Sequence, residues 1–188
     1  MIGVDWAGER RSLATRAETE PALDTGEFER IYRRHWPDVF RYAWLLGRNH
    51  HDAEDVASEA FRRSFEAWCA GRGPSGEPLP WLLLITRRIV VDRHRRSRLV
   101  RWLSIEKTRE PADERESAAF RSAEVWLWFE HLARVLPPNQ REALLLRFAF
   151  DLADEDAAKV LGTSVGNTRT LVSRGLAALR RHPEVTEQ

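Results

Sequence analysis

Residues 154–171 read DEDAAKVLGTSVGNTRTL, and this stretch decides the fold of the C-terminal part of the chain. Ala158 is small at the point where two helices would cross closely, and Gly162 follows four residues later, where a tight turn needs a left-handed backbone. Val165 and Leu171 supply apolar side chains that hold the second helix on the first. The spacing therefore predicts a helix-turn-helix, two short helices joined by a tight turn.

The second helix of this motif carries the candidate DNA-reading side chains. Ser164 is a favourable N-cap, and we expect the helix to run from Val165 to about Arg181. Its first turns would meet base edges and phosphates in a major groove, with Arg169 and Arg174 as the expected direct contacts. The full set of candidate contacts is Ser164, Asn167, Thr168, Arg169, Thr170 and Arg174. For the motif alone, a helical hairpin that only packs is the alternative.

Three more helices are expected in the N-terminal half, over residues 28–47, over 49–71, and from residue 80 onward. Pro37 lies inside the first of them and should bend or split it. Residues 71–78, GRGPSGEP, form a loop by every turn signal. Pro80 then suits the first turn of the third helix.

No alternating strand pattern or hairpin signal occurs, so the expected fold is all-α, with two small helical domains joined by a flexible linker and the helix-turn-helix in the second. Ahead of the motif, helical periodicity runs through Phe120, Ala123, Leu127, Leu132 and Val135. A length of 188 residues accommodates two domains of roughly 70 residues, each with its own small core. The expected segments are a mobile arm (1–24), an N-terminal domain (25–101), a polar linker (102–118), a C-terminal domain (119–182) and a tail (183–188).

The helix over 49–71 opens with an acidic strip, in which Asp52, Asp55 and Glu59 follow one another at steps of three and four residues. Carboxylates at that spacing repel one another, and the positive end of the helix dipole offsets this only in part. A basic external partner would stabilise them further. A solvated surface is the alternative, and a metal site is less favoured because ligands from another element would be needed.

The third helix ends in a basic run, because residues 87–101 hold seven arginines and one aspartate. Such a density of cations repels itself unless a polyanion lies close, and a phosphate backbone is the natural partner. Trp81 at the start of this helix could stack on bases pulled out of a duplex. An ordinary basic surface, enriched in Arg by a GC-rich genome, is the alternative.

Composition excludes several other classes of protein. The chain is 43% hydrophobic and 31% charged, with a net charge of +1, and no window of 18 apolar residues could span a bilayer. Cys69 is the only cysteine, so no internal disulfide is expected, and there is no secretory signal pattern. A cytoplasmic protein without a membrane partner is expected.

The order of acidic helix, basic helix, polar linker and helix-turn-helix resembles the extracytoplasmic-function (ECF) sigma factors of bacterial RNA polymerase. Residues 52–65, DAEDVASEAFRRSF, look like the family's core-binding segment, which docks on the clamp helices of the largest polymerase subunit. The resemblance implies polymerase contacts here, and with the acidic strip the candidate core-binding residues are Asp52, Asp55, Ser58 and Glu59. Ser58 stands where the family usually has Gln.

Residues 80–96, PWLLLITRRIVVDRHRR, are similar to the family's promoter-melting segment. The candidate DNA contacts of this segment are Trp81, Arg87, Arg88, Asp92, Arg93, Arg95 and Arg96. Arg88 replaces a usual Asn near the bases of the promoter element ten nucleotides upstream of the start, so the preference at that element is expected to differ from that of better-known relatives.

Residues 136–148, LPPNQREALLLRF, and 162–166, GTSVG, give the most specific match, to the region that reads the element thirty-five nucleotides upstream. Thr168 stands where Val or Ile usually anchors the reading helix, and Leu171 replaces a usual Arg. The preference at this element is therefore also expected to be the protein's own.

The resemblance implies a non-catalytic sigma subunit with no cofactor, which binds the polymerase core at the clamp helices and the flap region, recognises and melts promoter DNA, and is held by an anti-sigma protein. The competing interpretation is a stand-alone helix-turn-helix regulator, which leaves the acidic strip unexplained. A metal-dependent nuclease built on Asp52, Asp55 and Glu59 is weaker still.

Overall fold

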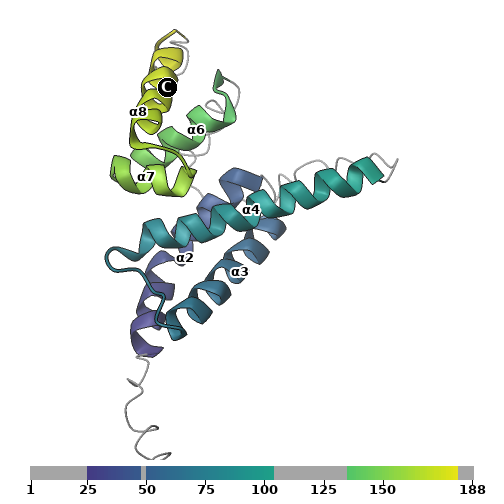
Figure 1. The fold of residues 1–188 in the computed structure, drawn as a ribbon, viewed down its shortest axis with the longest axis vertical. Helices are drawn as coiled ribbons and strands as arrows, with labels where there is room; N and C mark the ends of the chain where they lie inside the picture. The colour runs from purple at the N-terminus through teal and green to yellow at the C-terminus, as the bar shows by residue number, and fades with distance from the viewer. Residues whose placement is uncertain (1–24, 48–49, 104–134, 182–188) are drawn as a thin grey trace, which may run out of the picture.

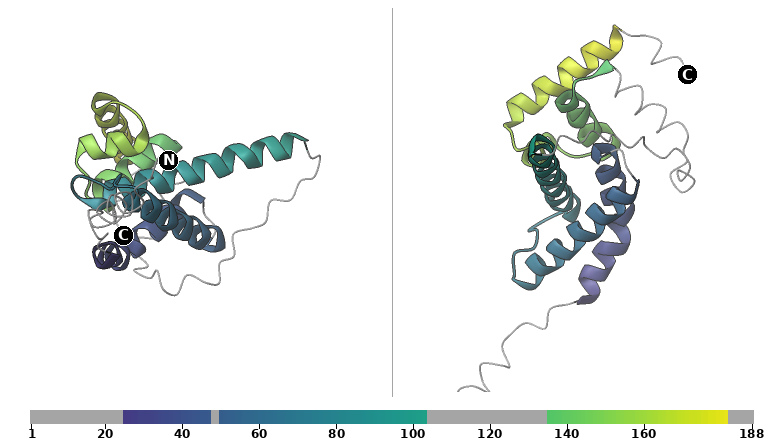
Figure 2. Two further views of the ribbon diagram at one scale, coloured as in Figure 1. Left: turned by 60° about the horizontal axis from the view of Figure 1, so that its bottom comes forward. Right: turned by 90° about the vertical axis from the view of Figure 1, so that its right-hand side faces the viewer.

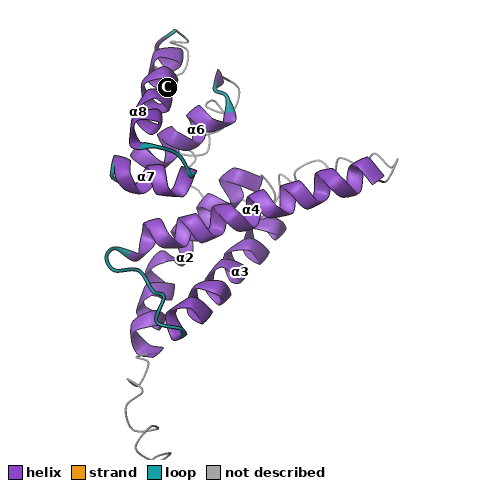
Figure 3. Ribbon diagram, in the orientation of Figure 1, coloured by secondary structure: helices purple, strands orange, loops and turns teal. Residues whose placement is uncertain are grey.

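The computed structural model describes residues 25–47, 50–103 and 135–181, and within these ranges every regular element is a helix (Figures 1 and 3), as expected. Three expected segments lie wholly or mostly outside the described residues, namely the arm, the linker and the tail. The apolar run 120–135 also lies outside them, except for Val135. The elements in chain order are α2 (Thr25–Gly47), α3 (His50–Cys69), α4 (Pro78–Leu103), α6 (Pro138–Leu144), the π-helix η2 (Leu145–Ala149), α7 (Asp154–Leu161) and α8 (Val165–Arg180).

Helices α2, α3 and α4 pack against one another and form the N-terminal group. Pro37 lies inside α2, yet the helix continues from Thr25 to Gly47, so the expected split does not occur. Ile31 before the proline and Val39 after it are both buried, and tertiary packing of this kind outweighs a single lost backbone hydrogen bond. Helix α4 begins two residues earlier than expected, at Pro78.

A defined turn links α3 to the loop that precedes α4. Gly71 has a φ of +66° and ends α3, while its N–H donates to the carbonyl of Trp68 at 2.9 Å. Gly73 then lies flat on the indole, because a Cβ at that position would stand 2.8 Å from a ring carbon of Trp68. Only glycine allows the backbone to approach the ring so closely.

Helices α6, η2, α7 and α8 form the C-terminal group, and the predicted helix-turn-helix is present in it. Gly162 ends α7 in the left-handed region, with φ 66° and ψ 39°. Ser164 caps α8, since its side chain accepts a hydrogen bond from the Asn167 N–H at 3.2 Å. Ala158, at the helix crossing, is buried. The sequence therefore predicted the local structure of this motif correctly.

A π-helical turn, which the sequence did not reveal, separates α6 from the loop before α7. The Phe150 N–H donates to the carbonyl of Leu145 at 3.1 Å, five residues back, and the Leu152 N–H donates to Leu146 at 3.0 Å. Asp151, which follows, has a φ of 49°. Backbone of this kind leaves no periodic signature in a short apolar run.

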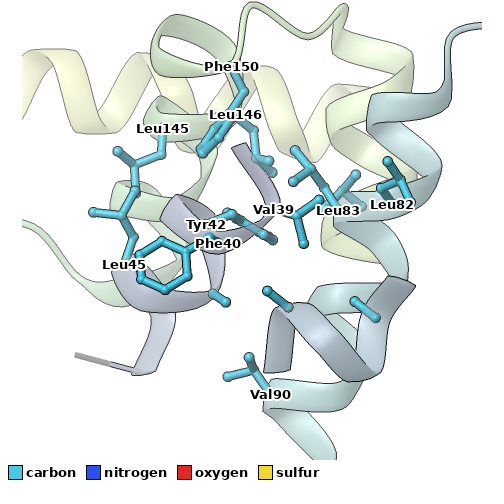
Figure 4. Close-up of a cluster of buried hydrophobic side chains, with 14 of the residues drawn as sticks. Val39, Phe40, Tyr42, Leu45, Leu82, Leu83, Val90, Leu145, Leu146 and Phe150 are labelled. Carbon is cyan, nitrogen blue, oxygen red and sulfur yellow. The ribbon is translucent and has the colours of Figure 1, made fainter. Parts of the chain in front are cut away.

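The two groups share one cluster of buried side chains (Figure 4), whereas the sequence predicts a small core in each. Helix α4 packs against α7. The Phe150 ring lies edge-on to the ring of Tyr42 with centroids 5.5 Å apart, and the Arg41 guanidinium stands 5.1 Å from the Phe150 centroid. Each group has an apolar surface that the other group covers. The hydrophobic periodicity within one group does not reveal such a contact.

Candidate functional site

Helix α4 presents the basic surface that the sequence predicted. Arg88, Asp92, Arg93, Arg95 and Arg96 are all exposed on it. Figure 2 shows the C-terminal part of α4 extending beyond the described helices that pack on it. One aspartate among four arginines gives a local cationic surface on a chain whose net charge is only +1. A surface of this kind favours the phosphates of a nucleic acid.

Arg87, at the start of the basic run, differs from these arginines because it is partly buried and already paired. Its Nε donates to Glu142 Oε1 at 2.8 Å and its Nη2 donates to Oε2 at 3.4 Å. Only 25% of its side chain is exposed. Sequence reasoning grouped Arg87 with the exposed arginines because the partner lies 55 residues away.

The loop before α4 is held at both ends. Gly73 lies on Trp68, as described above, and the Glu77 carboxylate lies 3.5 Å from Nε2 of His35 in α2. Burial lowers the pKa of His35, against the attraction of Glu77. Trp81, half-buried in the first turn of α4, therefore follows a loop of fixed position. No pattern in the sequence indicates the role of His35.

The acidic strip on α3 is more balanced in charge than expected. Asp52, Asp55 and Ser58 are exposed. Glu59, however, accepts hydrogen bonds from Nε of Arg62 and Nε of Arg63, both at 2.7 Å, and these bonds lower its pKa to about 2. Glu59 is therefore ionised at any physiological pH, but its charge is shared with its own helix.

Asp52, the first residue of the acidic strip, lies close to α4. Asp52 lines a shallow hollow together with Arg93 and His94 of α4. Within the described ranges, no group of three or more His, Cys, Asp or Glu side chains is arranged to hold a metal ion. Of the strip, Glu59 pairs with Arg62 and Arg63 of α3, and Asp52 lies near Arg93 of α4.

The outer face of α8 carries most of the predicted DNA-reading side chains. Asn167, Arg169, Thr170 and Arg174 are exposed, whereas Thr168 has no exposed surface. The Thr168 hydroxyl donates to the carbonyl of Ser164 at 3.1 Å, and the whole residue is buried. Thr168 is therefore removed from the candidate DNA surface and holds α8 in place.

Three of the outward side chains, Asn167, Arg169 and Thr170, already have hydrogen-bond partners. Arg169 Nε donates to Asp154 Oδ2 at 2.7 Å. The other oxygen of Asp154, Oδ1, forms a salt bridge with Arg147 Nε at 2.8 Å. The bond from Arg169 lowers the pKa of Asp154. Asn167 Nδ2 donates to Thr163 Oγ1 at 2.8 Å. Arg169 is 64% exposed, so an anionic ligand can reach it without any change in the fold.

A groove beside this face was missed by sequence reasoning. It combines apolar and cationic side chains of η2, α7 and α8, namely Arg147, Phe148, Asp154, Arg169, Val172, Ser173, Leu176 and Arg180. Phe148 is 57% exposed. The π-turn sets the direction of Phe148, and no spacing rule in the sequence predicts such a turn.

Two family models match the chain over these surfaces. Residues 31–100 match the region 2 model of sigma-70, and residues 126–179 match the region 4 model of sigma-70. The first range holds α4 and the acidic strip, and the second holds the helix-turn-helix. In the described part of the chain, no helix combines the length and apolar character that crossing a membrane requires.

Curated relatives agree with both matches. The ECF RNA polymerase sigma factor SigE of Mycolicibacterium smegmatis is 29% identical over 168 residues, which cover 86% of this chain and 65% of SigE. The ECF RNA polymerase sigma factor SigX of Bacillus subtilis is 22% identical over 167 residues, which cover 86% of each chain. The chain thus spans just under two thirds of SigE and most of SigX.

Solved structures share the fold. The sigma factor RpoE from Bartonella quintana, in complex with the anti-sigma factor NepR, superimposes with a TM-score of 0.71 over 86% of this chain and 97% of RpoE, at 22% identity. CnrH, in complex with the cytosolic domain of CnrY, gives a TM-score of 0.62 over 95% of this chain and 98% of CnrH, also at 22% identity.

Proposed function

Because this chain belongs to the ECF sigma factors of the sigma-70 family, we propose that it binds the RNA polymerase core through α3, opens promoter DNA with α4, and fixes the upstream position with α8. The observation that carries the proposal is the presence of two cationic helical surfaces, one in each matched region, which residues 104–134 separate in the sequence. The whole acts as a non-catalytic subunit in the cytoplasm, where polymerase works.

Core binding is assigned to α3. Asp55 and Ser58 are exposed on it and Glu59 is held in place by Arg62 and Arg63, so the face is ordered before a partner arrives. Ordering side chains in advance lowers the entropic cost of association. The clamp helices of the largest subunit are the proposed partner of this face, and the flap region is the proposed partner of the C-terminal group.

Promoter opening is assigned to α4 and the loop before it. Arg88, Arg93, Arg95 and Arg96 are exposed and can contact phosphates, and Trp81, in the first turn of α4 after the loop, can stack on an unpaired base. Asp92 is the one acid among them and can accept a hydrogen bond from a base amino group.

Upstream recognition is assigned to the outer face of α8, with Arg169 and Arg174 as base or phosphate contacts and with Ser164, Asn167 and Thr170 beside them. We also propose that an anti-sigma protein controls the chain. The structures of RpoE with NepR and of CnrH with CnrY support that proposal by fold.

Reconstitution tests the function. The purified chain is mixed with the RNA polymerase core of its own bacterium, and core binding and promoter-dependent transcripts are measured together. A sigma factor gives both, whereas a stand-alone regulator gives neither stable core binding nor initiation. Absence of both, with folded protein confirmed by circular dichroism, would overturn the proposal.

A further inference from the structure

We propose that the C-terminal group and promoter DNA compete for Arg87. In the free chain the Arg87 guanidinium pairs with the Glu142 carboxylate, and in the open complex it pairs with DNA instead. This inference rests on the proposed function, since it uses the assignment of α4 to DNA. The inference adds that a residue of the same chain, Glu142, covers part of the proposed DNA-binding surface. The chain would thus limit its own promoter binding before any other protein acts.

Glu142 joins three helices at one buried carboxylate. It lies on α6, and 9% of its side chain is exposed. Tyr42 of α2 donates its hydroxyl to Oε1 at 2.6 Å, and Arg87 of α4 donates to both oxygens. The pairs span 100 and 55 residues of sequence, so the contact links the C-terminal group to the N-terminal group.

The surroundings of this contact are apolar and well packed. Tyr42 has no exposed surface, and burial raises the pKa of its hydroxyl, which therefore stays a donor. Phe150 covers the Tyr42 ring. Leu83 of α4 and Leu146 of η2, both fully buried, belong to the same cluster (Figure 4). A carboxylate in such a place must keep its donors, because an unpaired buried charge is costly.

The contact between Arg87 and Glu142 contributes little free energy to the packing of the two groups, but it determines which anion Arg87 can pair with. A buried ion pair gains little over its separated, hydrated partners, so apolar packing supplies most of the attraction between the groups. Removing the charge of one partner, however, leaves the other charge buried and uncompensated, which disfavours the packed arrangement. Arg87, however, cannot pair with Glu142 and with a phosphate at the same time. In the closed arrangement the two groups are packed together, and in the open arrangement they are apart. A ligand that binds the open arrangement better shifts the population toward it, and the stability of the closed arrangement lowers the affinity for that ligand to the same degree.

The pairing of Arg169 with Asp154 shows what sets Arg87 apart. Both residues of that pair lie within the C-terminal group, and Arg169 is 64% exposed. DNA can therefore displace Asp154 without moving either group. At Arg87 the competing anion belongs to the other group, so its displacement requires the groups to separate.

Glu142→Gln tests the inference, with Asp151→Asn as its matched control. Both substitutions remove one negative charge from the C-terminal group, and Asn tolerates the positive φ of Asp151. Spin labels on the native, exposed Cys69 and on an exposed Ala177→Cys report the distance between the groups. A duplex with a pre-opened promoter bubble reports DNA affinity by fluorescence anisotropy, with no polymerase present.

The inference expects the unmodified chain to give one narrow distance distribution and Glu142→Gln to give a broader, longer one. It also expects Glu142→Gln to bind the bubble about tenfold more tightly if the closed form outnumbers the open form by about that ratio. Asp151→Asn should match the unmodified chain in both measurements. Tyr42→Phe keeps the buried ring, loses only the hydroxyl, and should fall between the two, which guards against a misfolded Glu142 variant.

Unchanged distances in Glu142→Gln and Tyr42→Phe would overturn the inference. Longer distances with unchanged bubble affinity would overturn it as well, while leaving the proposed function intact. If no chain bound the bubble at all, whatever the distances, both the inference and the assignment of α4 to DNA would fall.

Discussion

The Glu77 carboxylate lies 3.5 Å from Nε2 of the buried His35, and this contact fastens the loop before α4 to the middle of α2. The histidine is 5% exposed, and its Nδ1 finds no hydrogen-bond partner among the described residues. A second proton on this ring would therefore be buried without an acceptor. The loop that leads to Trp81 depends on a neutral histidine.

Acidification is expected to destabilise the protein through His35. Its pKa in the fold is lowered from the ordinary 6.5, chiefly by burial, so the unfolded chain binds the proton more readily. The stabilisation is complete above pH 6.5 and is lost as the pH falls through 6.5 toward the lower value. Urea unfolding at pH 7.5 and pH 5 measures it, and His35→Gln should show a smaller difference between the two. Equal differences would contradict the assignment.

Loss of Asp55 and Glu59 is expected to weaken polymerase binding without unfolding the chain. Both lie on the outer face of α3, so Asp55→Ala with Glu59→Ala removes no buried contact. We expect a loss of core affinity of at least about tenfold. Titration of labelled core with the variant measures it. Glu66→Ala, which removes another carboxylate paired with Arg62, is the control and should bind as the unmodified chain does.

Arg169→Ala is expected to weaken binding to the upstream promoter element by about tenfold while leaving the element ten nucleotides upstream unaffected. The reason is its exposed position on the first turns of α8. Gel-shift titrations of the holoenzyme on promoters altered at one element or the other separate the two effects. Lys159→Ala removes an exposed cation from α7 and serves as the control. Equal losses for both variants would indicate a general charge effect.

Thr168→Val is expected to stabilise the C-terminal group by up to about 1 kcal/mol. Its hydroxyl is fully buried and donates to a Ser164 carbonyl that already accepts the Thr168 N–H at 2.9 Å, so no acceptor is orphaned when the hydroxyl is replaced. Thr170→Val, exposed two residues later with the same kind of bond to Gly166, should change stability by less than about 0.5 kcal/mol. Thermal melts of both variants decide the matter, and a destabilised Thr168→Val would show that the hydroxyl itself is needed.

Local sequence rules predict the helix-turn-helix correctly. Gly162, Ser164 and Ala158 each have one structural role that spacing reveals, and the structure places all three as expected. Thr168 could have been placed as well, because steps of three and four residues along α8 put it on the buried face with Gly175. A rule for outward positions was applied there to an inward one.

Long-range relationships could not be predicted in the same way. Arg87 looks like any other member of a basic run until Glu142 is placed beside it, and nothing within either segment encodes the other. The same holds for Phe150 on Tyr42. The π-turn at 145–149 lies in an apolar run that fits an α-helix equally well. Pairings across such distances follow from how the two groups meet.

The pairing of Glu59 on the outer face of α3 has a consequence for how the chain behaves at different ionic strengths. Glu59 shares its charge with Arg62 and Arg63, so its attraction to a partner depends less on salt than that of an unpaired carboxylate. The arginines of α4 and α8 instead release counterions from DNA, and that gain falls steeply as salt is added. Rising ionic strength is therefore expected to detach this subunit from DNA well before it detaches it from polymerase.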